Sequence, residues 1–157
     1  MMTSLQCSGQ ELNGNTITKN NMTVRWRFHE DRIHFEMSAP TTGWVTIGFN
    51  THSGTKGAYL LMGNIVKGKP AVVEHYTLSP GNYQPIESLG ESAQVSDIAG
   101  VERANSSTLK FSLPVKSANQ YQQELAKGLN YTMIIAYSQE DDFQHHSMMR
   151  TSVDITL

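Results

Sequence analysis

The sequence has very little cysteine. Cys7 is the only one among 157 residues, so the chain cannot form an internal disulfide bond. No apolar run approaches the ~20 residues that a membrane-spanning helix needs, and the longest, residues 133–136, suits a strand. Basic residues are not in excess, since the formal net charge is -2 and lysine and arginine are scattered singly. These absences exclude a disulfide-stapled fold and direct membrane insertion, and they disfavour nucleic acid as a partner.

The common catalytic motifs are also missing. The chain contains no Gly-x-Ser-x-Gly, no phosphate-binding Gly-x-x-x-x-Gly-Lys and no dinucleotide-binding fingerprint. The acidic run at residues 140–142 has no second acid in view, so we interpret it as a solvated turn. The sequence therefore predicts a binding module and no enzyme.

The composition is that of an ordinary globular protein, with 38% hydrophobic and 17% charged residues. The length suits one domain, which we expect to span residues 1–157, with its core at about 15–157 and a frayed segment at 1–12. The first residues lack the charged and apolar regions of a signal peptide, although a mature exported chain would lack them too. The compartment must therefore be argued from other features.

Short segments rich in Val, Ile, Thr, Tyr and Phe alternate with Gly, Pro, Asn and Ser, which is typical of strands and turns. The expected strands are residues 16–19, 22–29, 32–38, 43–49, 58–65, 71–76, 95–102, 107–113, 131–138 and 150–157. Ten strands at this spacing predict an all-β, immunoglobulin-like antiparallel sandwich. Residues 117–127, followed by Gly128, predict one short connecting helix.

Two segments are candidates for a binding site. The polar, glycine-rich loop at residues 50–57 follows a core strand, and functional residues often lie on such loops. The cluster at residues 143–150 includes His145, His146 and two methionines. A neutral imidazole and a thioether are both axial ligands of haem iron. Adjacent histidines in an extended segment would point to opposite sides, so we expect His145 and His146 not to share one site.

The order of these pieces resembles the DOMON family. The resemblance lies in Gly-Trp-Val-Thr-Ile-Gly-Phe at residues 43–49, Gly-Ala-Tyr-Leu-Leu-Met-Gly at 57–63, and Ala-Tyr-Ser-Gln-Glu-Asp-Asp at 136–142, which leads to His146-x-x-x-Arg150. It spans about residues 20–157. It implies an immunoglobulin-like sandwich, usually extracellular or periplasmic, that binds b-type haem for electron transfer or binds sugars and other small ligands.

In haem-binding members of this family, a Met after the Gly-Phe strand and a His near the last strand hold the iron. His146 matches that His, whereas Thr55 stands where the Met is expected. His52 is then the implied second ligand, with Met62 or His145 as alternatives. The implied haem pocket is also lined by Tyr59 and Met148, with Arg150 or Lys56 near the propionates.

The resemblance thus leaves two functions open. The first is a haem b electron-transfer module that serves a redox partner protein or a membrane cytochrome. The second is a haem-free module of the same fold, in which His146 only donates or accepts a hydrogen bond. In that case a sugar or another flat ligand would stack on Trp44, Tyr59, Tyr76 and Tyr83.

Overall fold

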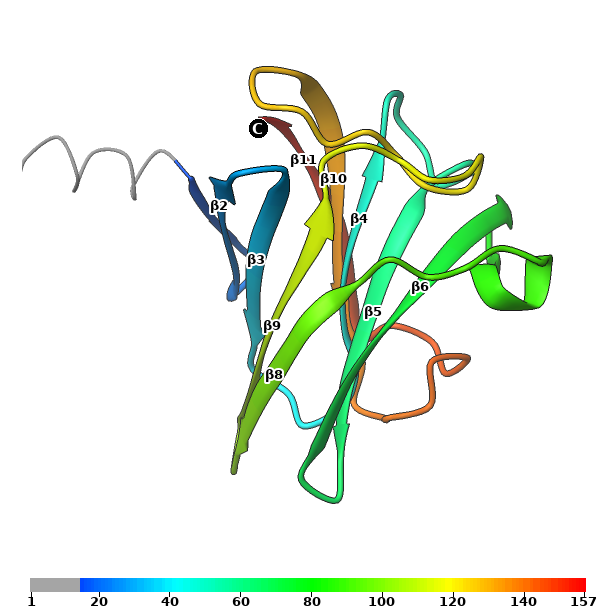
Figure 1. Cartoon of the computed structure of the whole chain (residues 1–157). Coiled ribbons are helices and arrows are strands. Elements are labelled where there is room, and N and C mark those ends of the chain that lie inside the picture. The colour runs from blue at the N-terminus through cyan, green and yellow to red at the C-terminus, as the bar shows by residue number, and fades with distance from the viewer. Residues whose placement is uncertain (1–14) are drawn as a thin grey trace, which may run out of the picture.

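The computed structural model describes residues 15–157, which form two antiparallel sheets packed face to face (Figure 1). Sheet A has the strand order β1-β2-β3-β9-β8, and sheet B has the order β11-β10-β4-β5-β6-β7. The prediction of an all-β sandwich is confirmed, while the expected frayed segment 1–12 lies outside the described residues. The elements are β1 (Thr16–Lys19), β2 (Met22–His29), β3 (Arg32–Ala39), β4 (Val45–Asn50), β5 (Tyr59–Val66), β6 (Lys69–Ser79), β7 (Asn82–Pro85), η1 (Ile86–Leu89), β8 (Ser96–Arg103), β9 (Ser106–Pro114), β10 (Asn130–Tyr137) and β11 (Met149–Thr156).

The core lies between the two sheets and follows the alternation of apolar residues along the strands. On β3, Ile33, Phe35 and Met37 are buried, while the residues between them are partly exposed. The ring of Phe35 lies 5.4 Å from that of Phe49 on sheet B and 5.5 Å from that of Phe111 on sheet A. The contact between Phe35 and Phe49 joins the two sheets across the core, while that between Phe35 and Phe111 lies within sheet A.

Sheet B differs from sheet A because its central strands are buried on both faces. Every residue of β4 is buried. Val45, Ile47 and Phe49 belong to the core between the sheets, whereas Trp44 belongs to a second apolar cluster on the outer face. Residues 139–148, the orange loop between β10 and β11 in Figure 1, supply Phe143 to that cluster. We call residues 139–148 the covering segment.

The helix predicted over residues 117–127 is wrong, because this segment forms turns. The side chain of Asn119 accepts a hydrogen bond from the backbone N–H of Tyr121 at 3.0 Å. The side chain of Gln122 accepts one from the backbone N–H of Ala118 at 2.8 Å. Such local bonds compete with the hydrogen-bond ladder of a helix.

The helical element of residues 15–157 is instead a 3₁₀ turn, η1, which follows directly on β7. The sequence pattern predicted neither of them, since β7 is only four residues long and ends in proline. Within the described residues, no helix has the length and hydropathy that crossing a bilayer requires.

A candidate ligand-binding pocket on sheet B

A pocket of about 270 Å³ lies between the outer face of sheet B and the covering segment. Strands β4, β5 and β10 form its floor, the covering segment forms its roof, and the loop after β4 reaches its rim. The residues that line it are Trp44, Thr46, Thr55, Leu60, Met62, Thr77, Gly81, Tyr83, Ile134, Ala136, Gln144, His146, Ser147 and Arg150. We call this pocket the sheet B pocket.

One hydroxyl group on the floor has no partner. The strand register aligns Ala136, Thr46 and Met62 across β10, β4 and β5, which places Thr46 between two apolar side chains. Thr46 is only 3% exposed, and its Oγ1 atom forms no hydrogen bond with any of residues 15–157. Buried polar groups are nearly always satisfied, so an orphaned hydroxyl in a pocket indicates a place for a ligand atom or an ordered water.

Three side chains of sheet B hold the covering segment down. The Trp44 indole Nε1 donates to the carbonyl of His145 at 3.2 Å, and the Asn64 amide donates to the carbonyl of Asp141 at 3.0 Å. The hydroxyl of Tyr83 donates to the carbonyl of Phe143. These bonds reach three different residues of the segment, so they keep the roof at a defined height over the floor.

His75 packs beneath the covering segment beside the pocket. Its ring lies 5.8 Å from that of Tyr83 and 5.6 Å from that of Phe143, both at steep angles. Burial lowers the pKa of His75, although a hydrogen bond between its Nδ1 and the carbonyl of Val73 acts in the opposite direction. A neutral imidazole therefore fills this position and supports the roof.

The roof also carries a carboxyl group in an unusual environment. The Oδ1 atom of Asp141 is buried without a hydrogen-bond partner. Burial, and then the neighbouring charge of Glu140, raise the pKa of Asp141. Burial and the charge of Asp142 raise the pKa of Tyr83 in the same way, which keeps its hydroxyl a donor to the roof.

Several residues singled out from the sequence meet in this pocket. His146 lies in the roof, Met62 in the floor and Arg150 at the start of β11. Thr55, which stands where the resemblance led us to expect a Met, also lines the pocket. The side chain at that position is thus at the site but carries a hydroxyl in place of a thioether.

Other predicted residues do not line the pocket. His52 is exposed, and its Nδ1 lies 2.8 Å from the carbonyl of Ser53. Lys56 is exposed and is absent from the lining, and Met148 is 57% exposed. Tyr59 points into the core between the sheets, where its hydroxyl donates to Glu74 at 2.6 Å. The expectation that Tyr59 lines the pocket is therefore corrected.

The expectation that His145 and His146 do not share one site holds in the pocket lining, although the condition behind it does not. The chain turns at residues 143–145 and is not extended there, and the two rings lie 5.3 Å apart. Only His146 lines the pocket. The carbonyl of His145 accepts the Trp44 hydrogen bond, so His145 serves the roof through its backbone.

Of the aromatic residues proposed for stacking, Trp44 and Tyr83 line the pocket, whereas Tyr59 and Tyr76 do not. The ring of Tyr76 packs against that of Tyr121, 5.0 Å away. Gln144 lies in the cluster singled out at residues 143–150, whereas sequence reasoning missed Thr46 and Thr77. A polar residue inside the otherwise apolar Val-Thr-Ile stretch at residues 45–47 was the available signal for Thr46.

Haem fits this pocket only in part. His146 and Met62 are the ligand types of a His/Met haem site, and both line the same cavity. The pocket volume of about 270 Å³ falls below the range of about 300–1,000 Å³ usual for drug-sized ligands, and a porphyrin is large among such ligands. The donor types match, but the pocket in this conformation would take up only part of the macrocycle.

A family model of the DOMON domain matches residues 18–138. The chain belongs to the DOMON domain family. The predicted family is thereby confirmed, and the match takes in the floor of the sheet B pocket while ending just before the covering segment, so that His146-x-x-x-Arg150 lies outside the matched residues. DOMON domains are binding or electron-transfer modules, and we class this chain with them and not with catalytic domains.

Solved structures show the same fold. The cytochrome b domain of pyranose dehydrogenase from Coprinopsis cinerea is 9% identical, with a TM-score of 0.70 and coverage of 90% of this chain and 80% of that chain. The cytochrome domain of Myriococcum thermophilum cellobiose dehydrogenase is 7% identical, with a TM-score of 0.65 and the same coverages of 90% and 80%. A candidate carbohydrate-binding protein from Bacteroides uniformis is 11% identical, with a TM-score of 0.53 and coverages of 98% and 82%. At these identities the likeness concerns the fold alone.

Proposed function

We propose that this DOMON domain binds a small, sugar-like ligand in the sheet B pocket without making or breaking a covalent bond. The observation that carries the proposal is Thr46, whose buried hydroxyl lines the pocket and has no partner. An unpaired buried hydroxyl costs about 1–3 kcal/mol, and a ligand that hydrogen-bonds to it recovers that cost.

The rest of the lining suits such a ligand. A sugar ring has a C–H face that packs on aromatic rings and a rim of hydroxyl groups. Trp44 and Tyr83 offer aromatic surface, while Thr77, Gln144 and Arg150 offer polar groups. The volume of about 270 Å³ suits a ligand of one or two rings. The likeness to a candidate carbohydrate-binding protein agrees with this class of ligand.

The first experiment is a titration of tryptophan fluorescence with a panel of hexoses, pentoses, hexosamines and hexuronates. The chain has two tryptophans, so a Trp26→Phe background leaves Trp44, in the pocket, as the reporter. The Nε1 atom of Trp26 has no hydrogen-bond partner among the described residues, and this change therefore removes no hydrogen bond seen in that part of the chain. We expect a saturable change in Trp44 emission with at least one sugar.

Thr46→Val tests the proposal at its central residue. The hydroxyl bonds to no atom of the described residues, so the variant should keep or gain thermal stability while binding the sugar about 5- to 10-fold more weakly. Thr132→Val is a matched control, because the Thr132 hydroxyl lies outside the pocket, 3.2 Å from Asp154. Unchanged affinity in Thr46→Val, or no response to any sugar, would refute the proposal.

Haem b is a second candidate, and the pairing of His146 with Met62 in one pocket favours it. The likeness to two cytochrome domains agrees with it. Binding would require the covering segment to rise, and the role would then be electron transfer with a redox partner protein or a membrane cytochrome. Titration with haemin should give a sharp Soret band that His146→Ala and Met62→Leu each abolish. A spectrum of free haemin in the wild type would eliminate this candidate.

We further infer that residues 1–157 act as one domain and that it works outside the cytoplasm, either extracellularly or in the periplasm. The family's usual location supports the second inference. An epitope-tagged full-length protein, followed through cell fractionation in its native host, tests it. Recovery in the cytoplasmic fraction would contradict it.

A further inference from the structure

A second and larger hollow, of about 630 Å³, lies on the outer face of sheet A. Strands β2, β3 and β9 form its floor. Asn15 and Thr16 stand at one side, and Asp97 and Ala99 of β8 at the other. We call it the sheet A groove. It faces away from the sheet B pocket across the whole core, so both can be occupied at the same time.

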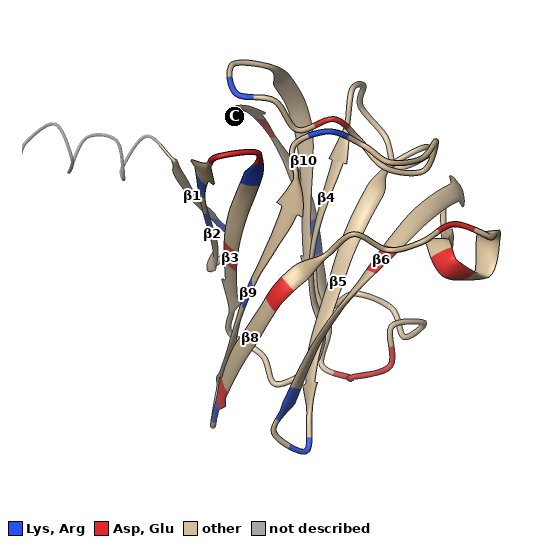
Figure 2. Cartoon of the chain, viewed as in Figure 1, with Lys and Arg blue, Asp and Glu red and all other residues tan. Residues whose placement is uncertain are grey.

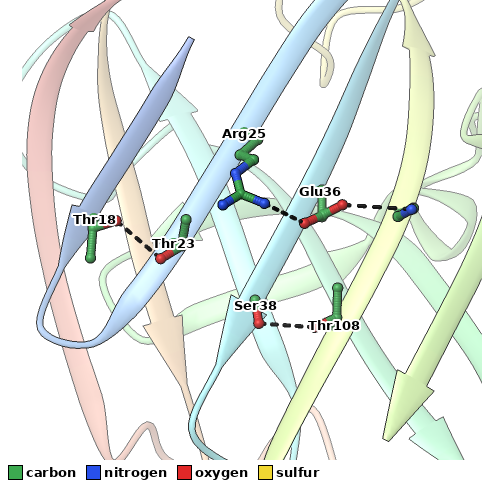
Figure 3. A network of polar contacts seen from close by, with 7 residues as sticks. Thr18, Thr23, Arg25, Glu36, Ser38 and Thr108 are labelled. Carbon is green, nitrogen blue, oxygen red and sulfur yellow. Dashed lines mark hydrogen bonds and ion pairs between the residues drawn. The ribbon is translucent and has the colours of Figure 1, made fainter. Parts of the chain in front are cut away.

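The floor of this groove carries a row of charges across three strands. The register aligns Arg25 of β2, Glu36 of β3 and Lys110 of β9. The Arg25 guanidinium lies 3.3 Å from the Glu36 carboxylate (Figure 3). The Lys110 ammonium lies 3.7 Å from the same carboxylate. Both cationic side chains remain more than 60% exposed, at 62% and 63%. One carboxylate thus balances only one of two accessible cations.

The next row adds another cation. Arg27 lies opposite His34 and forms no ion pair within residues 15–157. Burial, and then the charge of Arg27, lower the pKa of His34, which is consistent with a positive local field. The remaining acid, Asp97, accepts a hydrogen bond from the hydroxyl of Ser112 at 2.6 Å. Among the described residues that line it, the groove therefore has three permanent cations and two carboxylates, in a chain whose net charge is negative. Figure 2 marks Lys and Arg in blue and Asp and Glu in red, and both colours occur on the strands of sheet A.

Among the described residues, the groove offers no exposed Trp, Tyr or Phe ring for stacking. Trp26, Phe35 and Phe111 contribute atoms to its wall, but their side chains are buried in the core. A neutral sugar would therefore find hydrogen bonds but no ring to pack against. Exposed cations spaced across neighbouring strands suit recognition by charge, which confers specificity and speeds association.

We propose that the sheet A groove docks an acidic segment of a partner protein, whose carboxylates lie against Arg25, Arg27 and Lys110. Arg25 and Lys110 keep Glu36 between them, which fixes the spacing of the two cations before the partner arrives. The partner leaves the sheet B pocket open, so the domain can hold a ligand and a protein together.

The test uses a fluorescein-labelled oligo-glutamate peptide and the whole chain in low-salt buffer, read by fluorescence anisotropy. The groove variant is Arg27→Glu with Lys110→Glu. The matched control is Lys67→Glu with Lys69→Glu, at the exposed turn between β5 and β6, which changes the net charge equally. A neutral variant, Arg27→Gln with Lys110→Gln, removes the two positive charges without adding acidic residues that could disturb the fold. Equal melting temperatures establish that all variants are folded.

We expect salt-sensitive binding by the wild type, weakened at least about tenfold in the groove variant because two attractions become repulsions. The neutral variant should be intermediate, and the control should lose less than about twofold, since its charges lie on the other sheet. Equal losses in the groove variant and the control would show that only net charge matters and would overturn the proposal. Binding of polygalacturonate without binding of the peptide would also overturn it, in favour of an acidic sugar. Neither result bears on the sheet B pocket.

Discussion

Replacing Glu74 by glutamine should destabilise the fold, because four donors from three parts of the chain converge on this carboxylate. Its Oε1 accepts from the Tyr59 hydroxyl at 2.6 Å and from the Gln122 amide at 2.7 Å. Its Oε2 accepts from the backbone N–H groups of Gln94 and Val95. Glu74 is 1% exposed, so water cannot replace a lost bond.

The cost follows from the donor count. The new glutamine amide can keep its oxygen as the acceptor for the two backbone N–H groups and donate one N–H to the Tyr59 oxygen. Its NH₂ group then faces the NH₂ group of Gln122, and two donors cannot form a hydrogen bond with each other. Gln122 cannot turn to accept, because its oxygen already holds the N–H of Ala118. One buried donor is then unpaired, at about 1–3 kcal/mol, and two charge-assisted bonds become neutral, at about 1 kcal/mol each. The expected loss is about 3–5 kcal/mol, or about 10 °C in melting temperature.

Urea unfolding followed by tryptophan fluorescence, together with calorimetry, measures this loss. Tyr59→Phe is the matched control, since it removes one donor and leaves Glu74 with three, and it should cost only about 1–2 kcal/mol. A Glu74→Gln variant within about 0.5 kcal/mol of the wild type would refute the reasoning. It would mean that the four hydrogen bonds contribute no more than the desolvation of the carboxylate costs.

Gly43→Ala should leave little folded protein on a thermal melt, because its Cβ would lie 2.3 Å from the backbone oxygen of Ser138. Gly48→Ala should be milder, since the nearest atom, at 2.5 Å, belongs to the movable side chain of Leu60; equal losses would contradict this distinction. Because burial lowers the pKa of His75, the unfolded chain takes up a proton more readily than the folded one, so stability should fall as pH drops below about 6.5. His75→Gln should flatten that slope in urea titrations across this pH range, and an unchanged slope would assign the acid sensitivity to another group.

Much of the fold was predictable because buried apolar and exposed polar residues alternate along a strand, with a period of two residues. The hairpin of β2 and β3 shows this clearly, since Ile33, Phe35 and Met37 alternate with polar residues and all three are buried. The helix over residues 117–127 was not predictable in this way. Its outcome depends on Asn119 and Gln122, whose side chains can either face water in a helix or bond to the backbone in turns.

The same period of two also predicts that two of the candidate site residues lie on opposite faces of their strand. Tyr59 and Met62 are three residues apart on one strand, so they point to opposite faces and cannot both line one pocket. The sequence of that strand does not say which face the pocket occupies, because both faces are apolar and both are buried. The register with β4 and the covering segment decides it, and it selects Met62.

The sequence by itself determined the sandwich, the DOMON family and the place of His146 before the last strand, because these depend on local periodicity and on motifs read along the chain. Only the tertiary structure decided what surrounds that histidine. The height of the roof depends on hydrogen bonds from Trp44, Asn64 and Tyr83 to a segment 60 to 101 residues away in the chain. The roof and the strand register surround the Thr46 hydroxyl with groups that do not bond to it. These neighbours come from distant parts of the chain, so no local sequence pattern predicts that the hydroxyl is unpaired.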